Sequence, residues 1–216
     1  MKKQKYLLLL ILFFALAPVY LAAGQKVPTQ SVYQQVVLLV SLGAFGSMLG
    51  QFVLSRRLAR NPLGISMSGV VRIHRIIGYV AGSFFLVHPV LMVARRFWVL
   101  ESNPVDNFFL MLRTLALLPA IVAWCLMVVL IVLTATGMRK RLRGQKWRLV
   151  HGALSSGLVV AAAWHVIRTG RHSSVWMTVF WVLLAAWAIV PLLVSYLPAR
   201  STKSAVSAQG AIHEAI

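Results

Sequence analysis

Long apolar runs, separated by short polar or basic segments, extend along almost the whole of this chain. A helix that crosses a hydrocarbon core of about 30 Å needs about 20 mostly apolar residues, and runs of that length recur throughout the sequence. The pattern therefore predicts an all-α integral membrane protein, a six-transmembrane-helix bundle. The predicted spans are 6–23, 32–54, 70–93, 108–137, 147–167 and 175–197.

No segment between the spans is long enough to fold by itself, so we expect one compact membrane domain. Residues 1–31 form the first span and its outer link, 32–198 the core, and 199–216 a polar tail that is expected to be disordered. The first span follows basic residues and ends in Leu21-Ala22-Ala23, a layout that a cleaved signal peptide shares. Its apolar run is longer than a usual signal core, which favours a retained helix.

The positive charges of the connecting segments predict the orientation of the bundle. Lys and Arg concentrate at the N-terminus and in the segments 56–60 and 139–148, whereas 24–31 and 168–174 carry few. Cytoplasmic loops are enriched in Lys and Arg, so both termini are expected in the cytoplasm, with the outer loop 95–107 as the exception to the rule. A bacterial inner (plasma) membrane is the simplest location.

Composition agrees with this class, since 60% of the residues are hydrophobic and the mean hydropathy is +0.82. The net charge of +19 does not indicate a nucleic-acid-binding protein, because the basic residues lie in short clusters between apolar segments. Such clusters would attract anionic lipid headgroups. The single cysteine, Cys125, lies in a predicted span, which excludes a disulfide framework and favours a small buried apolar residue.

Four of the six histidines lie in predicted spans, where ionisable residues are costly and usually functional. His74 and His88 are 14 residues apart in the third span, and His151 and His165 are 14 apart in the fifth. Fourteen helical steps return to within about 40° of the same face after a rise of about 21 Å. The two spans run parallel, so His74 is expected level with His151 near the cytoplasm, and His88 level with His165 near the outside.

Two cross-helix histidine pairs at two depths match the geometry of two stacked haems, each with two axial imidazoles. The stripe between His74 and His88 contains Gly78 and Ala81, which would let a porphyrin approach the helix, and Phe85, which would pack between or beside the macrocycles. Arginines near the same ends would pair with the haem propionates. They are Arg72, Arg75 and Arg148 at the inner end and Arg168 and Arg171 at the outer end.

Other interpretations of these residues stay open. A single histidine in a span often bonds to a neighbouring helix, small residues often mark close helix packing, and arginines at span ends often serve topology alone. Zinc fits poorly, because the two pairs lie too far apart to share one ion and have no Asp, Glu or Cys nearby. A transporter with a histidine proton relay and a non-catalytic scaffold are the alternatives to electron transfer. His172 and His213 receive no role.

These residues resemble the ferric reductase-like transmembrane domain family, which includes NADPH oxidases, ferric reductases and the haem-binding membrane subunit of the bacterial methionine sulfoxide reductase system. The resemblance covers about residues 40–195 and implies an inner haem b on His74 and His151, an outer haem b on His88 and His165, and electron flow from the cytoplasmic face outwards. The resemblance rests on four segments: Arg72-Ile-His74-Arg75-Ile-Ile-Gly78, Val87-His88-Pro89, Lys146-Trp147-Arg148-Leu149-Val150-His151 and Trp164-His165.

The larger enzymes of that family continue into a cytosolic flavin- and NAD(P)H-binding domain, for which these 216 residues have no room. The resemblance therefore implies a separate reductase or a membrane quinol as donor, and an acceptor at the outer face that the sequence does not identify. With two imidazoles on each iron, electron transfer is favoured over oxygen binding. The expected protein is a transmembrane diheme b-type cytochrome, an oxidoreductase or electron-transfer subunit.

Overall fold

The computed structural model describes residues 2–25, 31–54, 66–100, 103–142, 144–170 and 174–196, and in these ranges all regular structure is helical. Two short 3-10 helices, η1 (Gln51–Leu54) and η2 (Leu115–Leu117), follow α2 and precede α5. The α-helices are α1 (Lys2–Ala23), α2 (Val32–Gly50), α3 (Met67–Leu100), α4 (Pro104–Arg113), α5 (Leu118–Ala135), α6 (Met138–Arg141), α7 (Gln145–Thr169) and α8 (Val175–Tyr196).

Within the described ranges, five helical segments are long and apolar enough to cross a membrane. Large apolar side chains such as Val80 (68% exposed) and Leu183 (64% exposed) face outwards, as expected where the surrounding medium is lipid. The prediction of a helical, multi-pass membrane protein is thus confirmed. The five segments are Val32–Gly50, Ser68–Ala94, Leu115–Ala135, Gln145–Thr169 and Val175–Val194. Helix α1 contributes the shorter apolar stretch Leu12–Ala23, so the sixth span stays a prediction.

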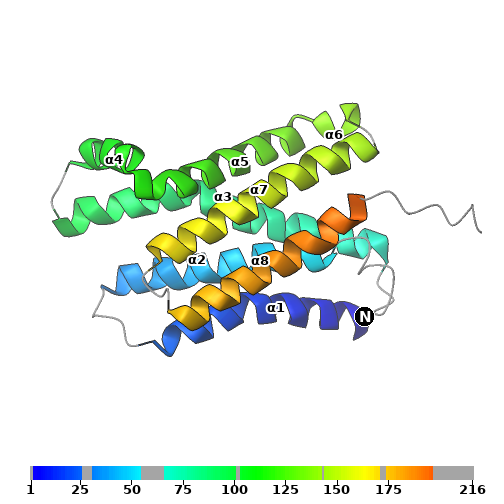
Figure 1. Cartoon of the computed structure of the whole chain (residues 1–216), viewed down its shortest axis with the longest axis horizontal. Helices are drawn as coiled ribbons and strands as arrows, with labels where there is room; N and C mark the ends of the chain where they lie inside the picture. Colours follow the sequence, from blue (N-terminus) through cyan, green and yellow to red (C-terminus); the bar gives the residue numbers. More distant parts are fainter. Residues whose placement is uncertain are drawn as a thin grey trace, which may run out of the picture.

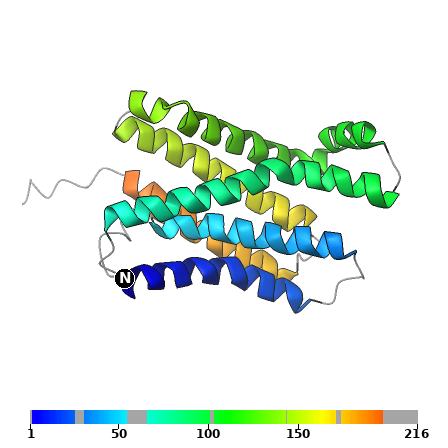
Figure 2. The same ribbon diagram turned by 180° about the vertical axis from the view of Figure 1, so that it is seen from behind.

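The long helices form an elongated bundle in which α1 packs on α2, α2 on α3, α5 on α7, and α7 on α8 (Figure 1). Figures 1 and 2 both show α3 and α7 running in the same direction, with α5 running the opposite way. The start of α1, the end of α8 and the basic helix α6 lie at one end of the bundle, which we name the basic end (Figure 1). α3 and α7 both begin at this end, as the sequence predicted for two parallel spans.

Three glycines on α2 let α1 approach closely. A Cβ added at Gly46 would overlap the backbone carbonyl of Phe14. A Cβ at Gly43 would lie 3.4 Å from the carbonyl oxygen of Ala15, and one at Gly50 would lie 3.0 Å from the Phe14 ring. Small residues are the usual means by which membrane helices pack backbone to backbone, so these glycines fix α1 against α2.

We expect Gly46→Ala to destabilise this packing by about 1–3 kcal/mol, because the carbonyl that the new methyl group meets is backbone and has no alternative rotamer. Thermal denaturation of the detergent-purified protein measures the loss. Gly24→Ala is the matched control, since its added Cβ would meet no neighbour closer than 3.9 Å. Equal melting temperatures for the two variants would contradict the close contact between α1 and α2.

The predicted loop 95–107 and the start of the predicted span 108–137 are wrong. α3 continues to Leu100, about two helical turns beyond the predicted end of the span at residue 93, and α4 already begins at Pro104, so most of the predicted loop is helical. Asn103 favours this start, because its side-chain oxygen accepts a hydrogen bond from the backbone N–H of Val105 at 2.9 Å.

The predicted fourth span is also interrupted. At Thr114 the backbone is extended (φ −80°, ψ 105°), and the membrane-spanning helix begins only after it. Pro119 in the first turn of α5 explains the interruption, because its ring would clash with the carbonyl of Leu115 if the helix ran through. The basic run 139–146, predicted as a loop, is partly helical, because α6 covers Met138–Arg141 and α7 begins at Gln145.

The prediction that Cys125 is buried is wrong, since its side chain is exposed on α5. The reason is that lipid covers the outside of a membrane-spanning helix, so an apolar residue there need not lie inside the protein. The basic segment 56–60, the residues Glu101 and Arg171, and the predicted tail 199–216 lie outside the described residues.

Candidate cofactor site between α3 and α7

The four histidines of interest lie on two helices, α3 and α7, that begin at the same end of the bundle. His74 and His88 are on α3, and His151 and His165 are on α7. Helix α5 packs on both, whereas α3 and α7 are absent from the closely packed helix pairs of the described residues.

The inner pair consists of His74 and His151, whose ring centroids are 6.2 Å apart with planes at 79°. Trp147, one turn before His151 on α7, stacks on that imidazole at 5.3 Å and 23°. His151 is half-buried and His74 is exposed. Both histidines lie in the parts of their helices nearest the basic end, so the predicted inner pair comes together in the fold.

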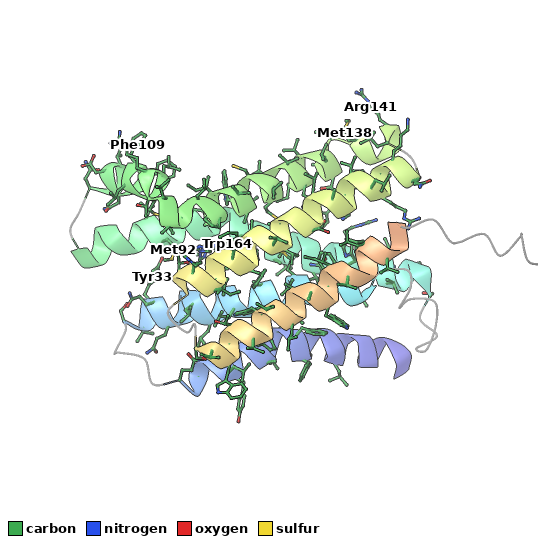
Figure 3. The ribbon with its side chains drawn as sticks, viewed as in Figure 1. Tyr33, Met92, Phe109, Met138, Arg141 and Trp164 are labelled. Carbon is green, nitrogen blue, oxygen red and sulfur yellow. The ribbon has the colours of Figure 1, made fainter. Side chains whose placement is uncertain are left out.

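The outer pair consists of His88 and His165, which are both half-buried. Figure 3 shows Met92 and Trp164 toward the end of the bundle opposite to Arg141. Since Met92 lies one turn beyond His88 and Trp164 precedes His165, the second pair lies at the level that the 14-residue spacing predicts.

Hydroxyl groups contact both outer histidines. The Oγ of Ser41, on α2, lies 3.3 Å from Nδ1 of His88. The Oγ1 of Thr169, one turn after His165 on α7, lies 2.9 Å from Nδ1 of His165. In both cases the contact is to Nδ1, which leaves Nε2 as the ring nitrogen directed away from the hydroxyl.

Aromatic rings and hydrogen bonds from neighbouring helices fix the His88 turn of α3. The ring of Phe84 lies 5.8 Å from the His88 ring. Pro89 cannot donate a helical hydrogen bond, and carbonyls on either side of it accept bonds from other helices, which is how membrane helices accommodate proline. The donors are Tyr33 Oη on α2, 2.8 Å from the Leu91 carbonyl oxygen, and Trp124 Nε1 on α5, 3.4 Å from that of Leu86.

The small residue beside the inner pair is not required by helix packing. Gly78 lies one turn after His74 and is exposed, and a Cβ added there would meet only Gln51 Oε1, at an ordinary 3.7 Å. This contrasts with Gly46, which a neighbouring backbone contacts. Of the other stripe residues, Ala81 is buried and Phe85 is half-buried, packed against the core and 6.4 Å from His88.

The arginines predicted to pair with propionates lie near the correct ends of the helices. Arg72 and Arg75 flank His74, Arg148 lies three residues before His151, and Arg168 lies three residues after His165. All four side chains are exposed. Their pairing with propionates stays a prediction.

The inner pair fits a metal held between two imidazoles. Metal–imidazole bonds are about 2 Å long and each nitrogen lies about 1.1 Å from its ring centre, which sets the ring centres about 6 Å apart. The observed 6.2 Å agrees. In the described ranges no three His, Cys, Asp or Glu side chains come together, so each pair would supply two ligands to an ion whose other ligands come from elsewhere, as in a macrocycle.

The contacts of Ser41 and Thr169 with the outer histidines were not predicted from the sequence. Thr169 follows His165 by four residues, and side chains four apart on a helix are neighbours, so this contact was predictable. Ser41 is on another helix, and its contact with His88 depends on how α2 packs on α3, for which the sequence contains no local signal. Trp147 was noted as part of a motif, but its stacking on His151 was not predicted.

One protein family and one relative match this chain. The family described as "Ferric reductase like transmembrane component" matches residues 40–162. An uncharacterized protein of Archaeoglobus fulgidus is 35% identical over 157 residues, which cover 71% of this chain and 85% of the relative. No solved structure matches the chain. The matched region includes His74, His88 and His151, and it ends just before His165.

Proposed function

Because this chain belongs to the ferric reductase-like transmembrane family, we propose that it is a transmembrane diheme b-type cytochrome. Membership indicates a membrane oxidoreductase or electron-transfer role, and transmembrane domains of this family generally bind haem. A bound haem would supply reversible one-electron chemistry at its iron. The finer proposal concerns the number of haems, their ligands and the direction of electron flow.

The observation that carries the proposal is the 6.2 Å separation of the ring centroids of His74 on α3 and His151 on α7. These two histidines would hold an inner haem, and His88 with His165 an outer one. Gly78 would leave room for the macrocycle beside His74.

The remaining predicted residues would contact the edges of the two haems. Phe85 would pack beside the outer one, next to His88. The propionates would accept charge-assisted hydrogen bonds from Arg72, Arg75 and Arg148 at the inner level and from Arg168 at the outer level. Exposed arginines with long, flexible side chains are able to reach carboxylates at the rim of the bundle.

We further propose that the basic end faces the cytoplasm, because cytoplasmic segments are enriched in Lys and Arg. Both termini would then be cytoplasmic, in a bacterial inner (plasma) membrane, and electrons would pass from a donor at the basic end to an acceptor at the opposite end. The donor would be a separate reductase or a membrane quinol. Anionic lipid headgroups would surround the basic end.

A dithionite-reduced-minus-oxidised absorption spectrum of the detergent-purified protein, with haem quantified per chain, tests the proposal. Sharp low-spin b-type bands and about two haems per chain are expected from two bis-imidazole sites. One haem per chain would limit the assignment to one pair. A colourless protein, purified from cells supplied with haem precursor, would contradict it.

The stacking of Trp147 on His151 leads to a more specific expectation. Trp147→Ala removes an aromatic pair worth about 0.5–1.5 kcal/mol, so the inner haem should be retained about two- to tenfold less tightly. Transfer of haem to excess apomyoglobin measures the loss. Trp147→Phe preserves a stacking ring and is the control. Equal retention in the Ala and Phe variants would show that the ring does not orient His151.

A further inference from the structure

We propose that Ser41 and Thr169 are positioning residues for the outer histidine pair: each hydroxyl accepts a hydrogen bond from the Nδ1–H of its histidine and so leaves Nε2 as the unprotonated nitrogen available to a metal. This inference rests on the proposed function and deepens it. It concerns what sets the tautomer and the donor strength of His88 and His165.

The geometry at Thr169 determines the direction of its hydrogen bonds. Its Oγ1 lies 2.6 Å from the backbone carbonyl oxygen of His165 and 2.9 Å from His165 Nδ1. Two oxygens at 2.6 Å require a hydrogen between them, since this is the short end of the O–H···O range. A threonine hydroxyl has one hydrogen, and the carbonyl accepts it. Toward Nδ1 the hydroxyl is therefore an acceptor, and Nδ1 carries the ring hydrogen.

Ser41 repeats the arrangement from a different helix. Its Oγ lies 2.6 Å from the carbonyl oxygen of Val37, four residues earlier on α2, and 3.3 Å from His88 Nδ1. The same argument commits the serine hydrogen to the carbonyl and makes His88 the donor. The two outer histidines thus receive one hydroxyl acceptor each, although the residues come from α2 and α7.

A hydrogen-bond acceptor on one imidazole nitrogen raises the basicity of the other. Ser41 and Thr169 would therefore make His88 and His165 stronger donors, which stabilises oxidised over reduced iron and lowers the midpoint potential of the outer haem. At the inner pair, Trp147 stacks on His151. The two hydroxyls would act on one haem and leave the other unchanged.

Redox titration and electron paramagnetic resonance of the full-length, haem-loaded protein test this proposal. Thr169→Val and Ser41→Ala should each raise the midpoint potential of one haem and shift its low-spin signal, while the other haem keeps both. Thr169→Ser should restore the wild-type values, because it returns the hydroxyl. His165→Ala, which should lack the outer haem, identifies which signal belongs to it.

Two further hydroxyls are matched controls. Ser47 bonds the Gly43 carbonyl oxygen at 2.7 Å on the same helix as Ser41, and Thr136 bonds the Val132 carbonyl oxygen at 2.8 Å with the same four-residue spacing as Thr169. Ser47→Ala and Thr136→Val remove hydroxyls that contact no assigned histidine, and they should leave both potentials unchanged.

The possible outcomes distinguish failure of this inference from failure of the proposed function. Unchanged potentials and spectra in a Thr169→Val protein that retains two haems would refute it while leaving the proposed function intact. Loss of both haems from the hydroxyl-free variants, but not from the controls, would assign Ser41 and Thr169 to packing alone. Selective loss of the outer haem in Thr169→Val, recovered in Thr169→Ser, would support it. Absence of haem from the wild-type protein would instead refute the proposed function.

Discussion

Replacement of His151 by alanine is expected to lower the haem content from two groups per chain to one. The methyl side chain cannot ligate iron, and His74 alone would leave one axial position without a protein ligand. The remaining group should keep the low-spin spectrum of the outer pair, since His88 and His165 lie about four turns away along their helices. Haem extraction and quantification per chain, together with the spectrum, measure the result.

The proposed pairing of His74 with His151 also predicts which haem each single variant and the double variant lose. His74→Ala and His151→Ala should lose the same haem, and the double variant should lose no more than either single one, because the two side chains act as a unit. His213→Ala is the control, since His213 has no assigned role. Two haems at full occupancy in all four single alanine variants of the paired histidines would show the ligand assignment to be wrong.

The second large expected effect is on electron transfer across the bilayer. In proteoliposomes with ferricyanide enclosed and dithionite outside, the wild-type protein should reduce the enclosed acceptor, and His165→Ala should lower the rate to that of protein-free vesicles. The variant would have one redox group where two are needed to cover a rise of about 21 Å between the histidine levels. Absorbance of the enclosed ferricyanide follows the reaction.

Thr136→Val is the matched control for this experiment, because Thr136 is the exposed C-cap of α5 and its hydroxyl bonds the Val132 carbonyl of the same helix. It should reconstitute and transfer electrons as the wild type does. Wild-type rates in a His165→Ala protein that has lost the outer haem would contradict the need for two groups in series.

The histidine pairs were predictable because the reasoning behind them is local. A 14-residue interval on a helix fixes the relative face and height of two side chains, and the parallel direction of α3 and α7 follows from counting the spans between them. The ring separation of His74 and His151 agrees with that reasoning. The family resemblance, carried by the segments around these same histidines, is confirmed by the match over residues 40–162.

Other features were not predictable because they depend on contacts between helices. Hydropathy alone does not distinguish α4 from α5, because both lie in one continuous apolar run of the sequence. The break at Thr114 depends on the effect of Pro119 on the helix that this run would otherwise form. The role of Gly46 requires knowledge that α1 packs on that face of α2. Ser41 looks like an isolated hydroxyl in an apolar run until the fold brings α3 beside it.

The division of each histidine pair between α3 and α7 has a consequence for synthesis of the protein. His151 follows His74 by 77 residues (151 − 74), and His165 follows His88 by the same number. At about 5–20 residues per second, the ribosome needs about 4–15 s after making one partner before it makes the other. Both binding sites are therefore completed late, after α5 has entered the membrane, so capture of the cofactor would follow insertion of most of the chain rather than guide it.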